Sequence, residues 1–153
     1  MSARGAGRVA YLLVALVSLC GAACTSSTPF TLAASGPFAD PAVVHPSLER
    51  VAILVTITNR SGDDLNVNPS DFVARDAEHR IYAANSTATI ADAGLVSGQA
   101  ARRGALPLPT VTLRGNDIIS GFVVFDVPSG VQPVELIWRQ SDTDTVANLS
   151  TAR

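Results

Sequence analysis

The sequence of 153 residues contains no lysine, and after Cys24 it contains neither cysteine nor methionine. Without further cysteines, no disulfide and no thiolate metal cluster can form in the chain beyond that point. A copper carrier of the β-sandwich type would need clusters of methionine and histidine, and histidine occurs only at positions 45 and 79. The fold must therefore be held by its core, which a domain of somewhat over a hundred residues can achieve.

The shortage of histidine also bears on catalysis. Hydrolysis needs a nucleophile, a base and an orienting group brought together, and the chain has no Gly-x-Ser-x-Gly motif. We expect His45 in a loop that leads into a strand and His79 in a hairpin turn. Asp76, Glu78 and His79 could hold a cation, but side chains of one turn rarely converge and the set is incomplete as a metal site. We expect no catalytic residue, no metal and no cofactor, and hence a protein that is not an enzyme.

The first 23 residues have the pattern of a secretory signal peptide. Arg4 and Arg8 precede an apolar stretch over 9–19, and the small residues 21–23 precede Cys24. A membrane-spanning helix needs about 20 apolar residues, whereas 9–24 supplies only 16. This favours a cleaved signal over a permanent span.

The ending Ala22-Ala23-Cys24 resembles the lipobox of bacterial lipoproteins, in which the cysteine receives a diacylglycerol and becomes the mature N-terminus. The resemblance implies lipidation of Cys24 and a location at the extracytoplasmic face of the cell membrane. Cys20 fits less well, because bulky Leu19 precedes it where a small residue is needed. The pattern at Cys24 departs from the family at one position, since Gly21 stands three residues before the cysteine, where the family usually has Leu. The alternatives are an ordinary cleaved signal and an uncleaved anchor. A diacylated cysteine supplies the two chains that stable anchoring requires.

The mature chain is mildly acidic. All eleven basic residues are arginines, and loss of Arg4 and Arg8 leaves nine against 13 acidic residues, a net charge near −4. Such a surface cannot release phosphate counterions, so we expect no binding to nucleic acid.

Residues 24–37 are expected to form the lipidated N-terminus and a flexible linker, because they are small, polar and uncharged. A coil of this length would hold the domain roughly 20 Å from the bilayer. The domain itself is expected to span 38–153.

The remaining chain is patterned as β-strands. Val51, Ile53, Val55 and Ile57 alternate with smaller or more polar residues in 48–59, and 118–127 forms a second long apolar run in which Gly121 marks a bulge or a close backbone approach. Further expected elements are a hairpin whose strands, 72–75 and 80–83, flank the turn 76–79, and a strand over 134–139 with Val134, Leu136 and Trp138 facing inward. No window after residue 37 predicts a helix. Short strands separated by turns predict an antiparallel two-sheet sandwich.

Parts of this pattern resemble the bacterial immunoprotective-antigen-like immunoglobulin domain. Its features appear here as Thr58-Asn59, Asn68-Pro69 with Phe72, Gly121 with Phe125, and Val127-Pro128, over roughly residues 48–138. The chain departs from the family at two turns. Arg114-Gly115 stands where the family usually has Pro-Gly before the late strand, and Asp76-Ala77-Glu78-His79 stands where it usually has Asp-x-x-Gly in the early hairpin. The resemblance implies an all-β, immunoglobulin-like sandwich in an exported or lipid-anchored protein, with no agreed biochemical activity.

The segment 90–109 lacks strand patterning and is long for a simple connection. It carries Arg102 and Arg103, an adjacent cationic pair, which we treat as a candidate partner-binding loop; the alternative is a solvated tip on an insertion. The leading hypothesis is a non-catalytic interaction module that binds an envelope protein or another envelope component. The alternative is a lipoprotein that binds a small ligand or lipid in a cavity between the sheets. A filled interior would favour the first.

Overall fold

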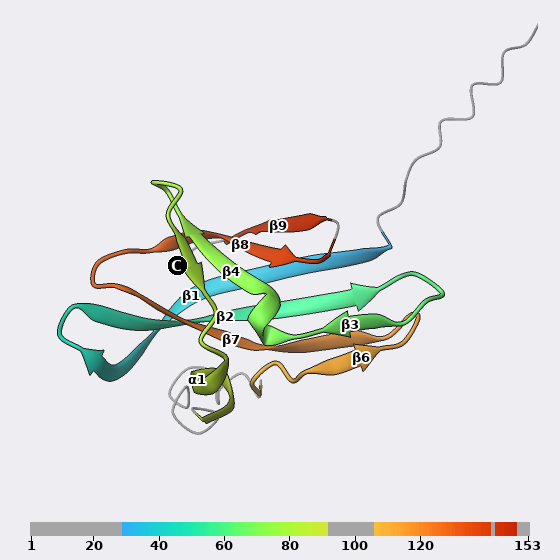
Figure 1. Ribbon diagram of the computed structural model, residues 1–153, viewed down its shortest axis with the longest axis horizontal. Coiled ribbons are helices and arrows are strands. Elements are labelled where there is room, and N and C mark those ends of the chain that lie inside the picture. Colours follow the sequence, from blue (N-terminus) through green and yellow to red (C-terminus); the bar gives the residue numbers. More distant parts are fainter. Residues whose placement is uncertain (1–28, 92–105, 142, 150–153) are drawn as a thin grey trace, which may run out of the picture.

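The computed structural model describes residues 29–91, 106–141 and 143–149. In that part of the chain, strands predominate and all strand pairs are antiparallel, as Figure 1 shows. The strands are β1 (Phe30–His45), β2 (Leu48–Asn59), β3 (Leu65–Val67), β4 (Phe72–Asp76), β5 (Ile81–Ala83), β6 (Val111–Leu113), β7 (Ile118–Pro128), β8 (Pro133–Arg139) and β9 (Asp144–Asn148). The helices are a 3-10 turn, η1 (Pro69–Asp71), and a six-residue helix, α1 (Ser86–Ala91). None of the described helices is long and apolar enough to cross a membrane.

The strands form a sandwich. One layer is the sheet β1-β2-β7, the other is the sheet β5-β4-β8-β9, and the short pair β3-β6 lies beside them (Figure 1). The predicted β-sandwich is confirmed. The alternation in β2 places Val51, Ile53, Val55 and Ile57 in the core, at most 5% exposed, as period-2 patterning predicts.

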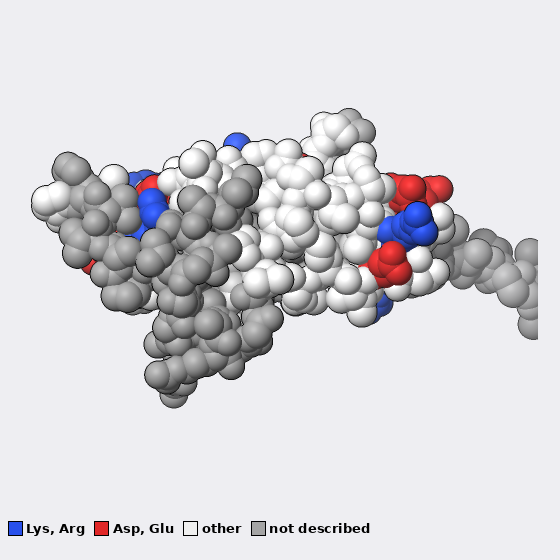
Figure 2. Space-filling model, turned by 90° about the horizontal axis from the view of Figure 1, so that it is seen from below, with Lys and Arg blue, Asp and Glu red and all other residues white. Residues whose placement is uncertain are grey.

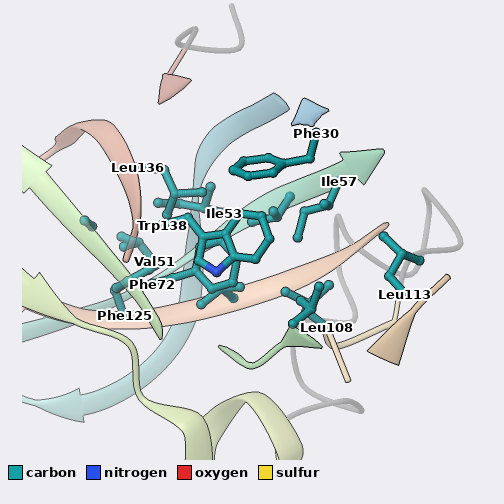
Figure 3. Close-up of a cluster of buried hydrophobic side chains, with 14 of the residues drawn as sticks. Phe30, Val51, Ile53, Ile57, Phe72, Leu108, Leu113, Phe125, Leu136 and Trp138 are labelled. Carbon is teal, nitrogen blue, oxygen red and sulfur yellow. The ribbon is translucent and has the colours of Figure 1, made fainter. Parts of the chain in front are cut away.

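The core between the two layers is filled by aromatic and branched side chains. Trp138 stacks on Phe72, with ring centroids 5.5 Å apart, and meets the ring of Phe30 edge-on at 5.0 Å (Figure 3). Around these rings pack Val51, Ile53, Val55, Ile57, Val67, Ala74, Leu108, Leu113, Val123, Phe125, Val127 and Leu136.

The first strand begins earlier than the sequence predicted. Residues 30–37 were expected as linker, but they belong to β1 and pair with β2 from Phe30↔Asn59 onward. Phe30 enters the core and is only 8% exposed. The prediction failed because the strand alternates weakly and is interrupted between Ser35 and Phe38. Its stability comes from pairing with β2, which composition does not reveal.

Three smaller expectations also change. His45 is the last residue of β1, in a hairpin with β2, rather than part of a loop. Val134 is 40% exposed instead of facing inward, because the register between β4 and β8 shifts there: Arg75 pairs with Glu135 but Asp76 pairs with Pro133. The segment expected to contain no helix includes α1, whose Ala88 N–H binds the Asn85 side chain.

Of the two expectations for Gly121, a bulge or a close backbone approach, the structure shows the close approach. The chain at 106–108 runs beside β7, where the Leu108 N–H donates to the Phe122 carbonyl and the Phe122 N–H donates to the Leu106 carbonyl, both at 2.9 Å. A Cβ on Gly121 would lie only 2.5 Å from the Leu108 Cα. This contact carries Leu108 into the core.

We therefore expect Gly121→Ala to destabilise the domain by about 1–3 kcal/mol, the usual cost of overpacking. The matched control is Gly62→Ala, because an added Cβ at Gly62 meets nothing within 4 Å. Denaturant unfolding of both variants measures the difference. Equal stability of the two would contradict the close approach.

Candidate functional site

The residues that carried functional hypotheses in the sequence lie in different parts of the chain. Cys24, Arg102 and Arg103 are outside the described residues, so lipidation and the partner-binding loop stay predictions. His79 lies in the exposed β4–β5 turn with a φ of 65°. Within the described ranges, no three His, Cys, Asp or Glu side chains are grouped so that they could hold a metal ion.

Asp76 organises the turn in which a cation site was considered. It is the last residue of β4 and only 4% exposed. One carboxylate oxygen accepts the backbone N–H groups of Glu78 and Arg80, both at 2.9 Å. The other accepts the Arg80 Nε and the Tyr82 hydroxyl, both at 2.7 Å. These four donors occupy the carboxylate, so its role is to fix the hairpin.

The same contacts set the acidity of Asp76. Burial by itself would raise the pKa of this carboxyl, but the hydrogen bonds from the Tyr82 hydroxyl and from Arg80 outweigh burial and lower the pKa to about 2. Asp76 is therefore ionised at neutral pH and holds no proton that it could donate as an acid.

A second carboxylate network lies on the sheet β1-β2-β7. Asp126 of β7 accepts the Arg50 Nε at 2.9 Å and the Asn85 amide at 2.7 Å. Burial pushes its pKa up, whereas the bonds from Arg50 and Asn85 push it down, and the net shift is downward. Because Asn85 also binds the Ala88 N–H, this network holds α1 against β7. Sequence reasoning missed both networks, because the pattern of residues does not show which side chains turn toward Asp76 within the hairpin. For Asp126 the partners also come from separate segments of the chain.

A polar cleft of about 490 Å³ opens at the surface beside β3, η1 and the β8–β9 connection. Asp71 and Arg139 bring opposite charges to it, and neither forms an ion pair with another residue in the described part of the chain. The other lining residues are Leu65, Asn66, Gln140, Ser141 and Thr143. Amides, hydroxyls and unpaired charges of this kind can hydrogen-bond a polar partner.

Comparison with known proteins places this architecture in a family. Residues 37–147 match the family described as a domain of unknown function, DUF4352. No curated protein sequence matches the chain significantly.

Several solved structures are similar to the chain, and three of them are compared with it below. The first is MPT63, a secreted protein from Mycobacterium tuberculosis, at 17% identity and a TM-score of 0.54, covering 78% of this chain and 82% of that one. The second is the ycdA protein of Bacillus subtilis, at 14% identity and a TM-score of 0.47; the similar region covers 76% of this chain and 33% of the ycdA chain. The yjhA protein of Bacillus subtilis, at 17% identity and a TM-score of 0.46, covers 79% and 90%. The likeness to MPT63 supports the sandwich fold.

The Asp76 network gives a prediction for stability against pH. The pKa of Asp76 is lower in the folded protein than the ordinary value near 3.9 of an unfolded chain, so the ionised carboxylate stabilises the fold. This contribution is fully present above that ordinary value and is lost as the pH falls toward 2.

We expect Asp76→Asn to lower the melting temperature at pH 7, with a difference from the parent that narrows between pH 5 and pH 2. The control is Glu78→Gln, since the Glu78 side chain is 73% exposed and should contribute little. Thermal melts followed by circular dichroism measure both. A difference independent of pH would show that the charge of Asp76 does not stabilise the turn.

Proposed function

The chain belongs to the DUF4352 family, a family of domains of unknown function, and from this premise we propose that it is a non-catalytic interaction module of the bacterial envelope. A lipid on Cys24 anchors the module at the extracytoplasmic face of the cell membrane, and its sandwich binds an envelope protein or another envelope component. The sequence pattern that ends in Ala22-Ala23-Cys24 supports the anchor.

The non-catalytic part of the proposal rests on the roles of the two carboxylates whose pKa values are shifted. Asp76 and Asp126 have lowered pKa values because hydrogen bonds hold them in the charged form, and those bonds fix a turn and a helix. Catalytic acids need the opposite, a proton retained near the working pH. Both carboxylates therefore act as structural groups in this proposal.

The packed interior favours a surface interaction over a ligand cavity between the sheets. Trp138, Phe72 and Phe125 are fully buried there. The cleft beside Asp71 and Arg139 lies instead at the surface, where it offers polar contacts to a partner. The interaction module is thus supported over the alternative of a lipid or small ligand held between the two sheets.

The anchor is tested by replacing the two cysteines separately. Cys24→Ala should abolish acyl labelling and partitioning into the detergent phase, while Cys20→Ala should leave both intact, because only a cysteine preceded by small residues fits the lipobox. Detergent-phase partitioning of the protein expressed in a bacterial host measures the effect. A Cys24→Ala protein that partitions like the parent would overturn lipidation at this site.

The partner-binding loop is tested by changing Arg102 and Arg103 together to Ala. Exposed loop substitutions usually change stability by less than about 0.5 kcal/mol, so the melting temperature should stay close to that of the parent. Crosslinking in intact cells should identify partners, and their capture should fall more than about tenfold in the double variant if the arginines make the contact. Unchanged capture would show that the partner binds elsewhere than at Arg102 and Arg103.

A further inference from the structure

One half of the outer face of the sheet β1-β2-β7 carries no charged side chain. The strand registers align its outward residues in rows, each running from β1 through β2 to β7. From the end near Phe30, the rows are Thr31–Thr58–Ile118, Ala33–Thr56–Ser120 and Ser35–Leu54–Phe122. We call the first two rows the open face.

Small side chains keep the open face flat. The Thr56 and Ser120 hydroxyls lie 2.8 Å apart and bond to each other, and Ile118 projects as the large apolar group, 65% exposed. The third row leads into the part that α1 covers, where Phe122 packs with Phe38 and Ala88. Only the half next to Phe30 is thus left without a covering element in the described part of the chain.

Charged side chains gather at the end of the sandwich beside the open face. In the view from below, where β6, β7 and α1 lie lowest in Figure 1, the charged side chains of the described residues lie toward the two ends (Figure 2). The end beside Phe30 is formed by the loops 60–64 and 114–117, whose charged residues of both signs are exposed: Arg60, Asp63, Asp64, Arg114 and Asp117.

The chain entering β1 brings the open face close to the anchor. Only five residues separate Cys24 from Phe30, because β1 starts inside the segment expected as linker. Fully extended, this stretch spans about 20 Å at most, and as a flexible coil it spans about 13 Å. Ile118 lies two strands away from β1, which adds roughly 10 Å. A lipid on Cys24 would therefore hold the open face within reach of the bilayer.

Electrostatics decides which surface can rest on the lipid. The loop end would press five exposed charged side chains, three Asp and two Arg, against the headgroups, and removing these charges from water costs free energy. The open face carries no charge to desolvate, and Ile118 gains by leaving water. Tethering raises the local concentration of the bilayer around the domain, so a contact too weak to bind by itself becomes populated.

We propose that the open face docks on the lipid surface of the membrane that anchors the protein, with Ile118 as its apolar contact. This inference rests on the proposed lipidation of Cys24. Docking lays the sheet β1-β2-β7 on the headgroups and turns the sheet β5-β4-β8-β9 toward the envelope. None of the residues that line the cleft beside Asp71 and Arg139 belongs to the sheet that touches lipid.

The test places a fluorescent label on either side of the sandwich in the lipidated, full-length protein. Cys20 is removed with the leader and the Cys24 thiol is acylated, so Ile118→Cys supplies the single reactive thiol. Val146→Cys is the matched control, since Val146 is 49% exposed and lies in β9 of the opposite sheet. Ser120→Cys provides a second position on the open face if the change at Ile118 disturbs folding.

The labelled proteins are incorporated into vesicles of phosphatidylcholine and phosphatidylglycerol, with and without brominated acyl chains. We expect brominated lipid to quench the label at position 118 roughly threefold more than the label at 146, as for a side chain inserted at the headgroup boundary. Aqueous iodide should instead quench the label at position 146 more strongly than the label at position 118.

Vesicle flotation separates failure of the anchor from failure of docking. If the full-length protein produced in a bacterial host does not float with vesicles while its fold is intact, lipidation of Cys24 is wrong. If it floats but brominated lipid quenches both positions equally, docking of the open face is wrong. Shielding of position 118 from iodide without quenching by brominated lipid would also overturn docking, because another protein chain would then cover the face.

Discussion

The stack of Phe30, Trp138 and Phe72 joins the two layers of the sandwich. Phe30 comes from β1, Trp138 from β8 and Phe72 from β4, so one set of ring contacts ties the sheet β1-β2-β7 to the sheet β5-β4-β8-β9 (Figure 3). No disulfide can take over this role, because the chain has no cysteine after Cys24. Aromatic rings bury a large area each and gain further from edge and stacked geometries. The stability of the domain thus depends on keeping the start of β1 in place.

That dependence links the core to the tether. Because Phe30 must stay in the core and 30–37 belong to β1, only residues 25–29 are left between Cys24 and the domain, and the distance available becomes short. A short tether restricts which surfaces can meet the bilayer. The same residue that completes the stack therefore limits how the protein can stand on a membrane under the proposed lipidation.

Polar groups serve the edges of the sandwich. Asp76 closes the β4–β5 hairpin through four hydrogen bonds, and Asp126 with Arg50 and Asn85 holds α1 on β7. Each of these carboxylates is held in its charged form by its donors, which is why both pKa values are lowered. These two networks fix a turn and a helix, positions that packing alone leaves loose.

The sequence by itself determined the features that depend on local periodicity and turn chemistry. The alternation of β-branched residues in β2 predicted four core residues: Val51, Ile53, Val55 and Ile57. The turn at 76–79 predicted the β4–β5 hairpin, and Gly121 predicted a bulge or a close backbone approach. Only the tertiary structure decided the features that depend on neighbours across space. Residues 30–37 are a strand because β2 lies beside them, Val134 is exposed because β4 shifts register against it, and Asp76 is occupied because Tyr82 and Arg80 converge on it. Likewise the open face exists only because three strands lie side by side. The residues of each row are 23 to 87 positions apart in the sequence and are brought together by backbone pairing.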